Sequence, residues 1–378
     1  MAETPTFCML SEAIGSCNAI AKVAQAGVMV ALNAGYKVTV IANRLDESLI
    51  DKVEWIPLYV PSRGFYVKWV SAEYFMKRAL GNRKFDIVHS HQPQAAHISD
   101  VFQCHFLTRI SRAKGCFTEI NSVKSAAKRL QEEGVLRAED RYYGSWNQST
   151  RMLYVSSMIK QQFEANYPAP QHAAVLSNAV PPLKPVSATD KREARKALLG
   201  DLADFPGPVL GYIGGCNPRK GYRELIASLE ASADNILLLM GGPRSNGFDV
   251  PALSKQGRFR CVGLTDNPAQ FYNACDVMAV PSYFDPCPLV VYEAVSRRVP
   301  VIASNGVGNL PDLIEYGAGL EWQGGTPVAP LVQHIVSNYA QFQTGADLLA
   351  SRVSTDAWCS NLLSVYTEVL ASKGIASV

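Results

Sequence analysis

Each half of the chain repeats one order of segments: a short apolar run, a turn of small residues and a helix-like stretch. In the first half, residues 6–10 (TFCML) predict a strand, Gly15–Ser16 a turn and 20–33 a helix, followed by a β-branched strand at 36–41. Strands separated by helices are typical of βαβ units, whose strands pair in parallel. Later strands are expected at 85–88, 101–104 and 152–155.

The pattern stops at a proline-rich joint, residues 180–185 (VPPLKP), and then begins again. A strand at 208–213, a glycine-bearing loop at 214–221 and a helix at 222–229 open the second half. Two α/β halves of similar order predict two similar domains. Further strands of the second half are expected at 236–240, 259–262, 277–280 and 299–303.

Length supports a division into two domains, because 378 residues exceed one ordinary hydrophobic core. We expect an α/β protein of two Rossmann-like lobes, each built on a parallel sheet. The first lobe comprises residues 1–183 and is rejoined by the C-terminal helix at 355–378, and the second comprises residues 184–354.

The composition excludes several classes of protein. The net charge is only +3, which gives no reason to expect nucleic-acid binding. The start MAETPTFCML lacks the basic and apolar regions of a secretory signal, and no apolar run reaches the roughly 20 residues that span a bilayer. None of the nine cysteines forms a C-x-x-C pair, which argues against a zinc knuckle or a redox dithiol. We expect a cytoplasmic protein with reduced cysteines.

Residues that directly follow a strand are the first candidates for a ligand site. In an open parallel sheet, ligands bind outside the carboxyl ends of the strands. With two lobes, the cleft between them is the default site. Gly15 and Ser16 follow the first strand and precede a helix, where backbone N–H groups can approach a phosphate. A plain tight turn explains these two residues equally well.

Three histidines also follow strands. His105 comes after the strand at 101–104, and His89 and His91 come after the strand at 85–88. A histidine in this place can donate to a sugar hydroxyl, although a structural role is the more common one. No third ligand is evident beside His89 and His91, so we expect no metal there.

The loop at 213–225 (IGGCNPRKGYREL) joins a strand to a helix and carries Arg219 and Lys220 just before the helix. It lacks the G-x-x-x-x-G-K-[ST] spacing of a P-loop. The helix dipole disfavours a cation at a helix start. The presence of Lys220 there therefore indicates a function, such as neutralising a diphosphate. A solvated cation remains equally open.

The stretch SYFDPCPLVVYEA (282–294) brackets the start of an apolar helix with two acids. Pro288 fits the first turn of a helix that begins near Leu289, because the missing N–H costs nothing there. Asp285 stays in the loop and can accept hydrogen bonds from sugar hydroxyls, while Glu293 lies over a turn into the helix and can accept from a ribose. A capping acid and a surface glutamate are the alternative.

In this order, the motifs resemble those of the retaining glycosyltransferases of family 4, which have the two-lobed GT-B fold with parallel sheets facing a central cleft. PSYFDPCPLVVYEA is similar to the family pattern PSxxEGFGLVxLEA, with Asp285 and Glu293 in the two acidic positions. GYIGGCNPRKGYRELI is similar to GRxxxxKGxxxLI, GVGNLPDLI to GGxPELI, LSNAVP to PNGVD, and FDIVHSH to DVVHxH. The resemblance covers nearly the whole chain.

The resemblance implies transfer of a sugar, with retention, from a nucleotide-diphosphate donor such as a UDP-sugar to an acceptor hydroxyl in glycan, glycolipid or polysaccharide biosynthesis. The catalytic residues would be His105, Asp285 and Lys220, and Glu293 would bind the donor ribose. The donor would also contact Gly15, Ser16, Gly214, Gly215, Arg219, Leu264, Cys287, Pro288, Leu289 and Val290. Such enzymes need no metal or other cofactor, because cationic side chains and helix N-termini stabilise the departing diphosphate.

Three positions depart from the family pattern. The family's phosphate-binding arginine would stand at position 215, which is Gly215 here, and Arg219 of the same loop is the substitute. Asp285 is one methylene shorter than the usual glutamate, and Pro288 replaces a glycine that has an N–H. These changes predict a weakened enzyme or an unusual donor.

Other functions remain as alternatives. A nucleotide-sugar epimerase or a phosphorylase could use the same architecture, and a two-lobed sugar-binding protein would need no chemistry. A glycoside hydrolase is disfavoured because both acids stand at one helix end and cannot flank a scissile bond. A dehydrogenase is disfavoured because no G-x-G-x-x-G follows the first strand.

The acceptor is expected in the first lobe. Residues 105–141 hold eight Lys and Arg against five Asp and Glu, with Phe106 and Leu107 among them. This basic stretch could contact the inner face of a membrane or a lipid-linked acceptor, although a solvated basic helix is favoured. We expect a glycan or lipid-linked acceptor and leave peripheral membrane contact open.

Overall fold

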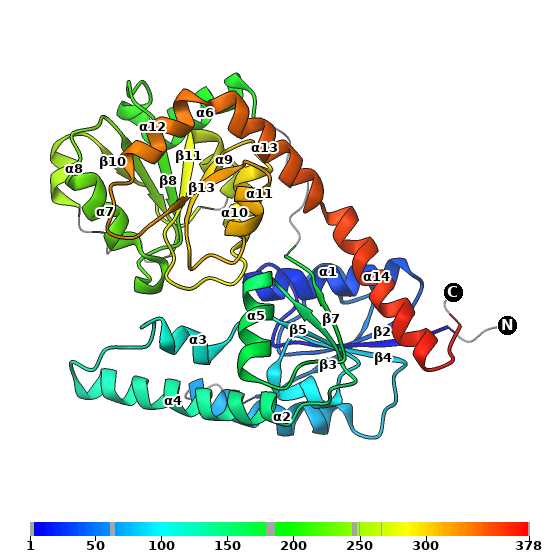
Figure 1. Ribbon diagram of the computed structural model, residues 1–378. Coiled ribbons are helices and arrows are strands. Elements are labelled where there is room, and N and C mark those ends of the chain that lie inside the picture. The colour runs from blue at the N-terminus through cyan, green and yellow to red at the C-terminus, as the bar shows by residue number, and fades with distance from the viewer. Residues whose placement is uncertain are drawn as a thin grey trace. The chain divides into compact units, whose positions relative to one another are not determined.

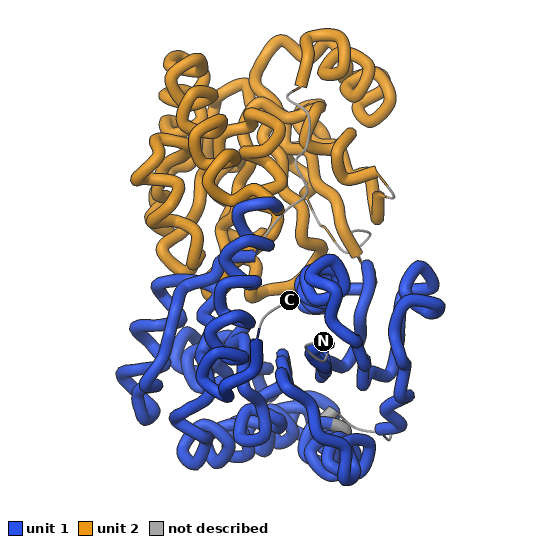
Figure 2. The backbone as a smooth tube through the Cα atoms, turned by 90° about the vertical axis from the view of Figure 1, so that its right-hand side faces the viewer, with its two compact units in different colours: residues 1–178, 356–378 blue, residues 179–355 orange. Residues whose placement is uncertain are grey.

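The computed structural model describes residues 4–60, 65–178, 186–243, 248, 250–265 and 267–376. The chain divides into two compact units, residues 1–178 with 356–378 (unit 1) and residues 179–355 (unit 2) (Figure 2). The sequence analysis placed the joint at 183/184, within the stretch 179–185 that lies outside the described residues.

Unit 1 contains a seven-stranded parallel sheet in the order β3-β2-β1-β4-β5-β6-β7. Its strands are β1 (Thr6–Leu10), β2 (Lys37–Ala42), β3 (Glu54–Pro57), β4 (Ile87–Ser90), β5 (Val101–Cys104), β6 (Arg151–Tyr154) and β7 (His172–Val175). Its helices are α1 (Ala19–Asn33), α2 (Phe65–Leu80), α3 (Thr108–Ala113), α4 (Val123–Gly144), α5 (Ser157–Asn166) and α14 (Thr355–Ser372), with short 3₁₀ turns η1 (Glu47–Leu49) and η2 (Pro93–Ile98).

Unit 2 contains a six-stranded parallel sheet in the order β10-β9-β8-β11-β12-β13. Its strands are β8 (Val209–Ile213), β9 (Leu237–Gly241), β10 (Phe259–Cys261), β11 (Val277–Val280), β12 (Val301–Ser304) and β13 (Gly319–Trp322). Its helices are α6 (Ala188–Leu199), α7 (Tyr222–Glu230), α8 (Pro251–Lys255), α9 (Pro268–Ala274), α10 (Leu289–Val295), α11 (Leu310–Glu315), α12 (Ala329–Ser337) and α13 (Tyr339–Arg352), with 3₁₀ turns η3 (Gly200–Leu202) and η4 (Pro218–Lys220).

Strands β9 and β11 of unit 2 are apolar on both faces, because helices cover each side of the sheet (Figure 1), whereas β4 and β5 of unit 1 also bury the polar side chains of His89 and Gln103. In β9, Leu237, Leu238, Leu239 and Met240 are all fully buried. Polar side chains set where several helices start: the Asn18 side chain accepts from the Ala21 N–H at the start of α1. The two parallel-sheet units confirm the predicted α/β class.

Helix α14 joins the end of the chain to unit 1. The Tyr366 ring packs against Phe7 of β1, with ring centroids 5.1 Å apart, and Lys373 forms an ion pair with Asp100 at 2.6 Å. Gly27 lets α1 approach α14, because an added Cβ there would lie 3.4 Å from the Tyr366 hydroxyl and 2.9 Å from Met9. The last helix is therefore part of the core of unit 1.

The strand order reverses once in each sheet, between β1 and β4 in unit 1 and between β8 and β11 in unit 2. At such a point the loops that leave neighbouring strands diverge to opposite faces, and the gap between them is the usual ligand site of an open parallel sheet. This rule identifies two places to search for functional side chains.

The strand bounds correct one prediction. The strand expected at 85–88 is β4 at Ile87–Ser90, so His89 lies inside a strand rather than after it. The cause is that Phe85 and Asp86 precede the pairing: the Thr6 backbone N–H donates to the Asp86 carboxylate at 2.7 Å. Strands β3, β7 and β13 were not predicted, and β3 and β7 are edge strands whose side chains are mostly exposed.

Candidate functional site

The loop after β8 is held against the neighbouring strand ends by two glycines. Gly215 has φ +65°, and a Cβ there would lie 2.0 Å from the Pro243 carbonyl oxygen. Gly221 has φ +69°, and a Cβ there would lie 1.8 Å from the Pro281 carbonyl oxygen. A side chain at position 215 has no room and is disfavoured by the backbone conformation. The family's arginine therefore cannot occupy this position without moving the loop.

Lys220, Arg219 and Asp285 meet at the strand reversal of unit 2. The Lys220 ammonium group donates to the Asp285 carboxylate, and the Arg219 guanidinium lies 3.9 Å from the same carboxylate. Arg219 also donates to the Phe284 backbone carbonyl, and its own carbonyl accepts from the Tyr283 N–H at 3.0 Å. The loops after β8 and β11 are thus joined through cations. Sequence reasoning placed Arg219 and Lys220 in one loop and Asp285 in another, and the structure brings them together.

Asp285 is only 8% exposed, and its backbone is fixed on both sides. The Asp285 N–H donates to Gly306 at 2.8 Å, and its carbonyl accepts from Gly308 at 2.9 Å. The Ser282 hydroxyl lies 3.5 Å from the carboxylate. A pair of cations facing one buried carboxylate gives a site that can hold a phosphate group and a sugar hydroxyl side by side. Ser282 was part of the stretch singled out in the sequence, but no role was predicted for it.

Glu293 lies in α10 and is partly buried. The Tyr272 hydroxyl of α9 donates to its carboxylate at 2.6 Å. Burial raises the pKa of Tyr272 well above its usual value, and the Glu293 carboxylate raises it further, so the phenol stays protonated and remains a donor. Tyr272 carries no local sequence signal, because it comes from another helix. The carboxylate has lone pairs left for a ligand such as a ribose.

The other predicted donor residues are spread over this end of the sheet. The backbone N–H groups of Gly214 and Gly215 both donate to Gly241, at 3.1 and 3.3 Å, so they shape the loop rather than offer donors to a ligand. Leu264 is 73% exposed and follows β10, two strands away from β8. Cys287 and Pro288 are buried, whereas Leu289 and Val290, in the first turn of α10, are partly exposed.

Pro288 differs from its expected position. It is the N-cap residue of α10, with φ −65° and ψ 123°, rather than a residue of the first turn. The buried Asn309 amide lies 3.5 Å from its carbonyl. The missing N–H of Pro288 therefore falls outside the helix, where the N-cap position normally offers its carbonyl and side chain to the helix.

Three histidines form a stacked row at the strand reversal of unit 1. His89 stacks on His91 with ring centroids 4.7 Å apart, and His91 stacks on His105 at 5.0 Å. His91 Nδ1 and His105 Nε2 share a hydrogen bond of 2.7 Å, and His89 Nδ1 is 2.8 Å from the Tyr366 hydroxyl. Burial lowers the pKa of His89 and of His105 to about 3 and that of His91 well below 6.5. The row is neutral at physiological pH.

Gly15 and Ser16 lie in the loop after β1, on the other side of the same reversal. Gly15 has φ +134°, and a Cβ there would lie 3.1 Å from the Asp46 carboxylate. The Gly15 N–H donates to Ala21 at 3.2 Å, which leaves Ser16 exposed at the loop surface. The small residues are thus needed for a tight turn, and the predicted approach of a ligand to this loop stays a prediction.

A cavity of about 120 Å³ opens at the same edge of the unit 1 sheet. Glu12, Asn43, Leu58 and Gln92, which line it, follow β1, β2, β3 and β4, and α2 closes it with Trp69 and two smaller apolar residues. Its walls combine apolar surface with amide and carboxylate groups. Such a mixture suits a small hydroxyl-bearing molecule.

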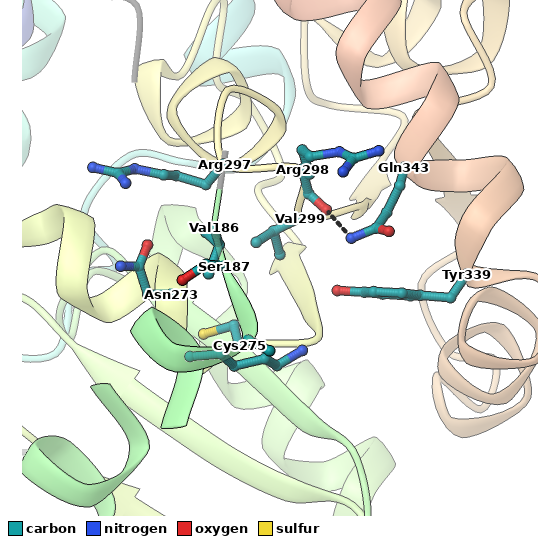
Figure 3. A pocket seen from close by; sticks show the side chains of 11 residues that line it. Val186, Ser187, Asn273, Cys275, Arg297, Arg298, Val299, Tyr339 and Gln343 are labelled. Carbon is teal, nitrogen blue, oxygen red and sulfur yellow. Dashed lines mark hydrogen bonds between the residues drawn. The ribbon is translucent and has the colours of Figure 1, made fainter. Parts of the chain in front are cut away.

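A second cavity, of about 180 Å³, lies at the opposite end of the unit 2 strands (Figure 3). Cys275 and Val299, which line it, precede β11 and β12. Lys191 in its wall pairs with Asp276 at 2.5 Å, and Arg298, with an unusual φ of +61°, pairs with Asp347 at 3.0 Å. Lys191 and Arg298 thus form ion pairs within the unit, and the cavity is separate from the cluster around Asp285.

Three findings bear on the remaining expectations. Within the described residues, no group of three or more His, Cys, Asp and Glu is arranged to hold a metal ion. None of the described helices is long and apolar enough to cross a membrane. The basic stretch at 105–141 is partly neutralised, because four of its arginines pair with carboxylates: Arg109, Arg112, Arg129 and Arg141. Membrane contact stays a prediction.

Comparison with known proteins identifies the class. Residues 30–182 match the family model "Glycosyltransferase Family 4", and residues 207–339 match "Glycosyl transferases group 1". The first match lies in unit 1 except for its last four residues, the second lies in unit 2, and together they span most of the chain. The protein therefore belongs to the family 4 glycosyltransferases with the GT-B fold, as the sequence motifs predicted.

Among curated relatives, the D-inositol 3-phosphate glycosyltransferase of Salinispora arenicola is 24% identical over 332 residues, which are 79% of this chain and 71% of the relative. That of Streptomyces scabiei is 25% identical over 272 residues, which are 65% of this chain but only 58% of the relative.

Solved structures show the same fold at low identity. WaaG, a glycosyltransferase involved in lipopolysaccharide biosynthesis, has a TM-score of 0.72 and 14% identity, covering 96% of this chain and 99% of WaaG. HepE of Anabaena, solved with UDP-glucose, has a TM-score of 0.69 and 14% identity, covering 96% of this chain and all of HepE. The likeness establishes the two-sheet architecture.

Proposed function

We propose that the protein is a retaining hexosyltransferase that moves a sugar from a nucleotide-diphosphate donor to an acceptor hydroxyl. The observation that carries the proposal is the cluster of Lys220, Arg219 and Asp285 at the strand reversal of unit 2. Two cations there can hold a diphosphate, and a carboxylate beside them can accept from the hydroxyls of the attached sugar.

A UDP-sugar is the donor that we propose first. Glu293, oriented by the Tyr272 hydroxyl, would accept from the ribose hydroxyls, while Lys220 would leave Asp285 in part to reach the diphosphate. HepE, which shares the fold, binds UDP-glucose, and this supports the same class of donor here. No metal is needed in this scheme, because the charge that develops on the leaving diphosphate is met by Lys220 and Arg219.

The proposed reaction forms one glycosidic bond and breaks one. The acceptor oxygen bonds to the anomeric carbon as the bond to the diphosphate breaks, and the hydroxyl proton passes to a departing phosphate oxygen. Because both occur on one face of the sugar, the configuration is retained. The two cations stabilise the leaving group, so removing one raises the barrier more than it weakens donor binding.

For the acceptor, we propose the cavity of unit 1 lined by Glu12, Asn43, Gln92 and Trp69. The relatives named D-inositol 3-phosphate glycosyltransferases make that compound the first acceptor to test. Since the cavity offers amides and a carboxylate, uncharged inositol and simple sugars should be tested beside it. A biosynthetic role in glycans, glycolipids or polysaccharides is part of the proposal.

The test compares two lysines that each pair with an aspartate in unit 2. Lys220→Ala is expected to lower the rate of sugar transfer at least tenfold, because it removes one charge-assisted contact to the leaving group. Lys191→Ala removes the equally paired lysine near the other cavity and is expected to leave the transfer rate near that of the wild type. Transfer is measured as labelled product with UDP-glucose and the acceptors above.

Equal rates in the two variants would contradict the proposed site. Product analysis separates the alternatives: an epimerase converts the donor sugar without any acceptor, whereas a transferase needs one. A binding protein without chemistry would show a donor-induced rise in melting temperature but no product.

A further inference from the structure

The row of His89, His91 and His105 leaves a single way to place its protons. The hydrogen bond between His91 Nδ1 and His105 Nε2 requires exactly one proton between the two nitrogens. If His105 held it, His91 Nδ1 would accept, and the one proton of neutral His91 would sit on Nε2. If His91 holds it on Nδ1, then His105 must carry its own proton on Nδ1.

All three rings are neutral, because nothing around them favours a charge. His89 and His91 are 0% and 4% exposed, and the groups that act on their charge most strongly are the neighbouring histidines and the loss of solvent. In the part of the chain that the structure describes, no carboxylate forms an ion pair with any of the three; the other neighbour is the Tyr366 hydroxyl of α14. Each ring therefore carries one N–H.

His91 Nε2 decides between the two arrangements. It is buried and has no hydrogen-bond partner among the described residues. A proton on this atom would be a buried donor with no acceptor, whereas a bare nitrogen would be an unused acceptor. Unpaired buried N–H groups are the rarer and costlier of the two. The arrangement with His91 Nδ1–H as the donor is favoured.

We propose that His91 is a positioning residue that fixes His105 as the Nδ1–H tautomer, so that His105 acts on a ligand as a neutral hydrogen-bond donor and not as a base. His105 is the partly exposed end of the row, and its Nδ1 has no partner among the described residues. The donor would meet an acceptor oxygen, such as a sugar hydroxyl. The identity of the ligand rests on the proposed function, but the tautomer of His105 does not depend on that function.

The tautomer is measured directly in ligand-free protein by long-range ¹H–¹⁵N NMR correlation of ¹⁵N-histidine-labelled enzyme. Signals are assigned with His105→Asn, which removes the ring. We expect His105 to have a protonated Nδ1 and a bare Nε2. A protonated Nε2 in the wild type would overturn the inference.

Two variants test the role of His91. His91→Leu removes the N–H that donates to His105, so His105 should convert at least in part to the Nε2–H tautomer. We expect kcat to fall about tenfold, which is the size of effect expected for one hydrogen bond, with a smaller change in the KM for the nucleotide sugar. His91→Asn offers an amide N–H near the place of Nδ1 and should restore the Nδ1–H tautomer and most of the lost rate. Persistence of the Nδ1–H tautomer in His91→Leu would refute the positioning role.

The outcomes distinguish the two proposals. A changed tautomer with an unchanged kcat in His91→Leu would refute the catalytic use of His105 while the tautomer assignment stands. Absence of transfer by the wild type with every donor would refute the proposed function, and the NMR result would still decide the protonation of the row.

Discussion

Gly215 offers the sharpest test of how the site is built. In Gly215→Ala two costs add: the residue must keep φ near +65°, and its Cβ would lie 2.0 Å from the Pro243 carbonyl oxygen. Gly317 in the same unit has φ +66°, and a Cβ there meets nothing within 4 Å. Gly317→Ala therefore carries the conformational cost alone and is the matched control.

The magnitudes follow from the two geometries. A non-glycine residue in the left-handed region costs about 1–2 kcal/mol, which is the whole effect expected for Gly317→Ala. Relieving a close backbone contact adds about 1–3 kcal/mol in Gly215→Ala. For a unit of this size each kcal/mol corresponds to roughly 2–4 °C, so Gly215→Ala should melt about 2–12 °C below Gly317→Ala.

The assay measures the unfolding of unit 2 by urea or by heat. Because both glycines lie in that unit, the same unfolding transition is compared in the two variants. Equal losses of unfolding free energy would refute the claim that position 215 has no room for a side chain. The loop carries Arg219 and Lys220, so Gly215→Ala should also reduce donor binding, measured by the donor-induced rise in melting temperature.

Two further predictions concern unit 1. Its unfolding free energy should fall as pH drops from about 6.5 towards 3. The reason is that His89 and His105 have a folded pKa of about 3 and therefore take up protons in this range only on unfolding. An unfolding free energy that does not change with pH over this range would contradict the neutral row. Tyr366→Phe should lower the unfolding free energy by about 0.5–1.5 kcal/mol, because it removes the hydroxyl next to His89 while the ring stays packed on Phe7. If calorimetry shows no such loss, this hydrogen bond is not formed.

The sequence predicted the fold well because its signals are local. Apolar runs such as 101–104 and 277–280 coincide with β5 and β11, and the helix that begins at Leu289 does so in the structure. The edge strands β3 and β7 were missed, because strands whose side chains are mostly exposed show no alternation of buried and exposed positions. Their places beside helix starts made Asp285, Glu293 and Lys220 candidates, and the family motifs then gave each of them a role.

Partners from distant parts of the chain could not be predicted. Tyr272 orients Glu293 from 21 residues away, and Tyr366 reaches His89 across 277 residues. Such contacts depend on how helices pack on a sheet, and no local pattern encodes them. The same holds for the space at Gly215: the sequence showed a missing arginine, but only the backbone of Pro243 explains why a side chain is absent.

The split of unit 1 along the chain has a consequence for biosynthesis. During translation, residues 179–355 emerge as one continuous piece that can complete its sheet, while the earlier-made half still lacks the helix that covers Phe7 and His89. Part of the interior of the first half therefore stays uncovered until residues 356–378 have been synthesised.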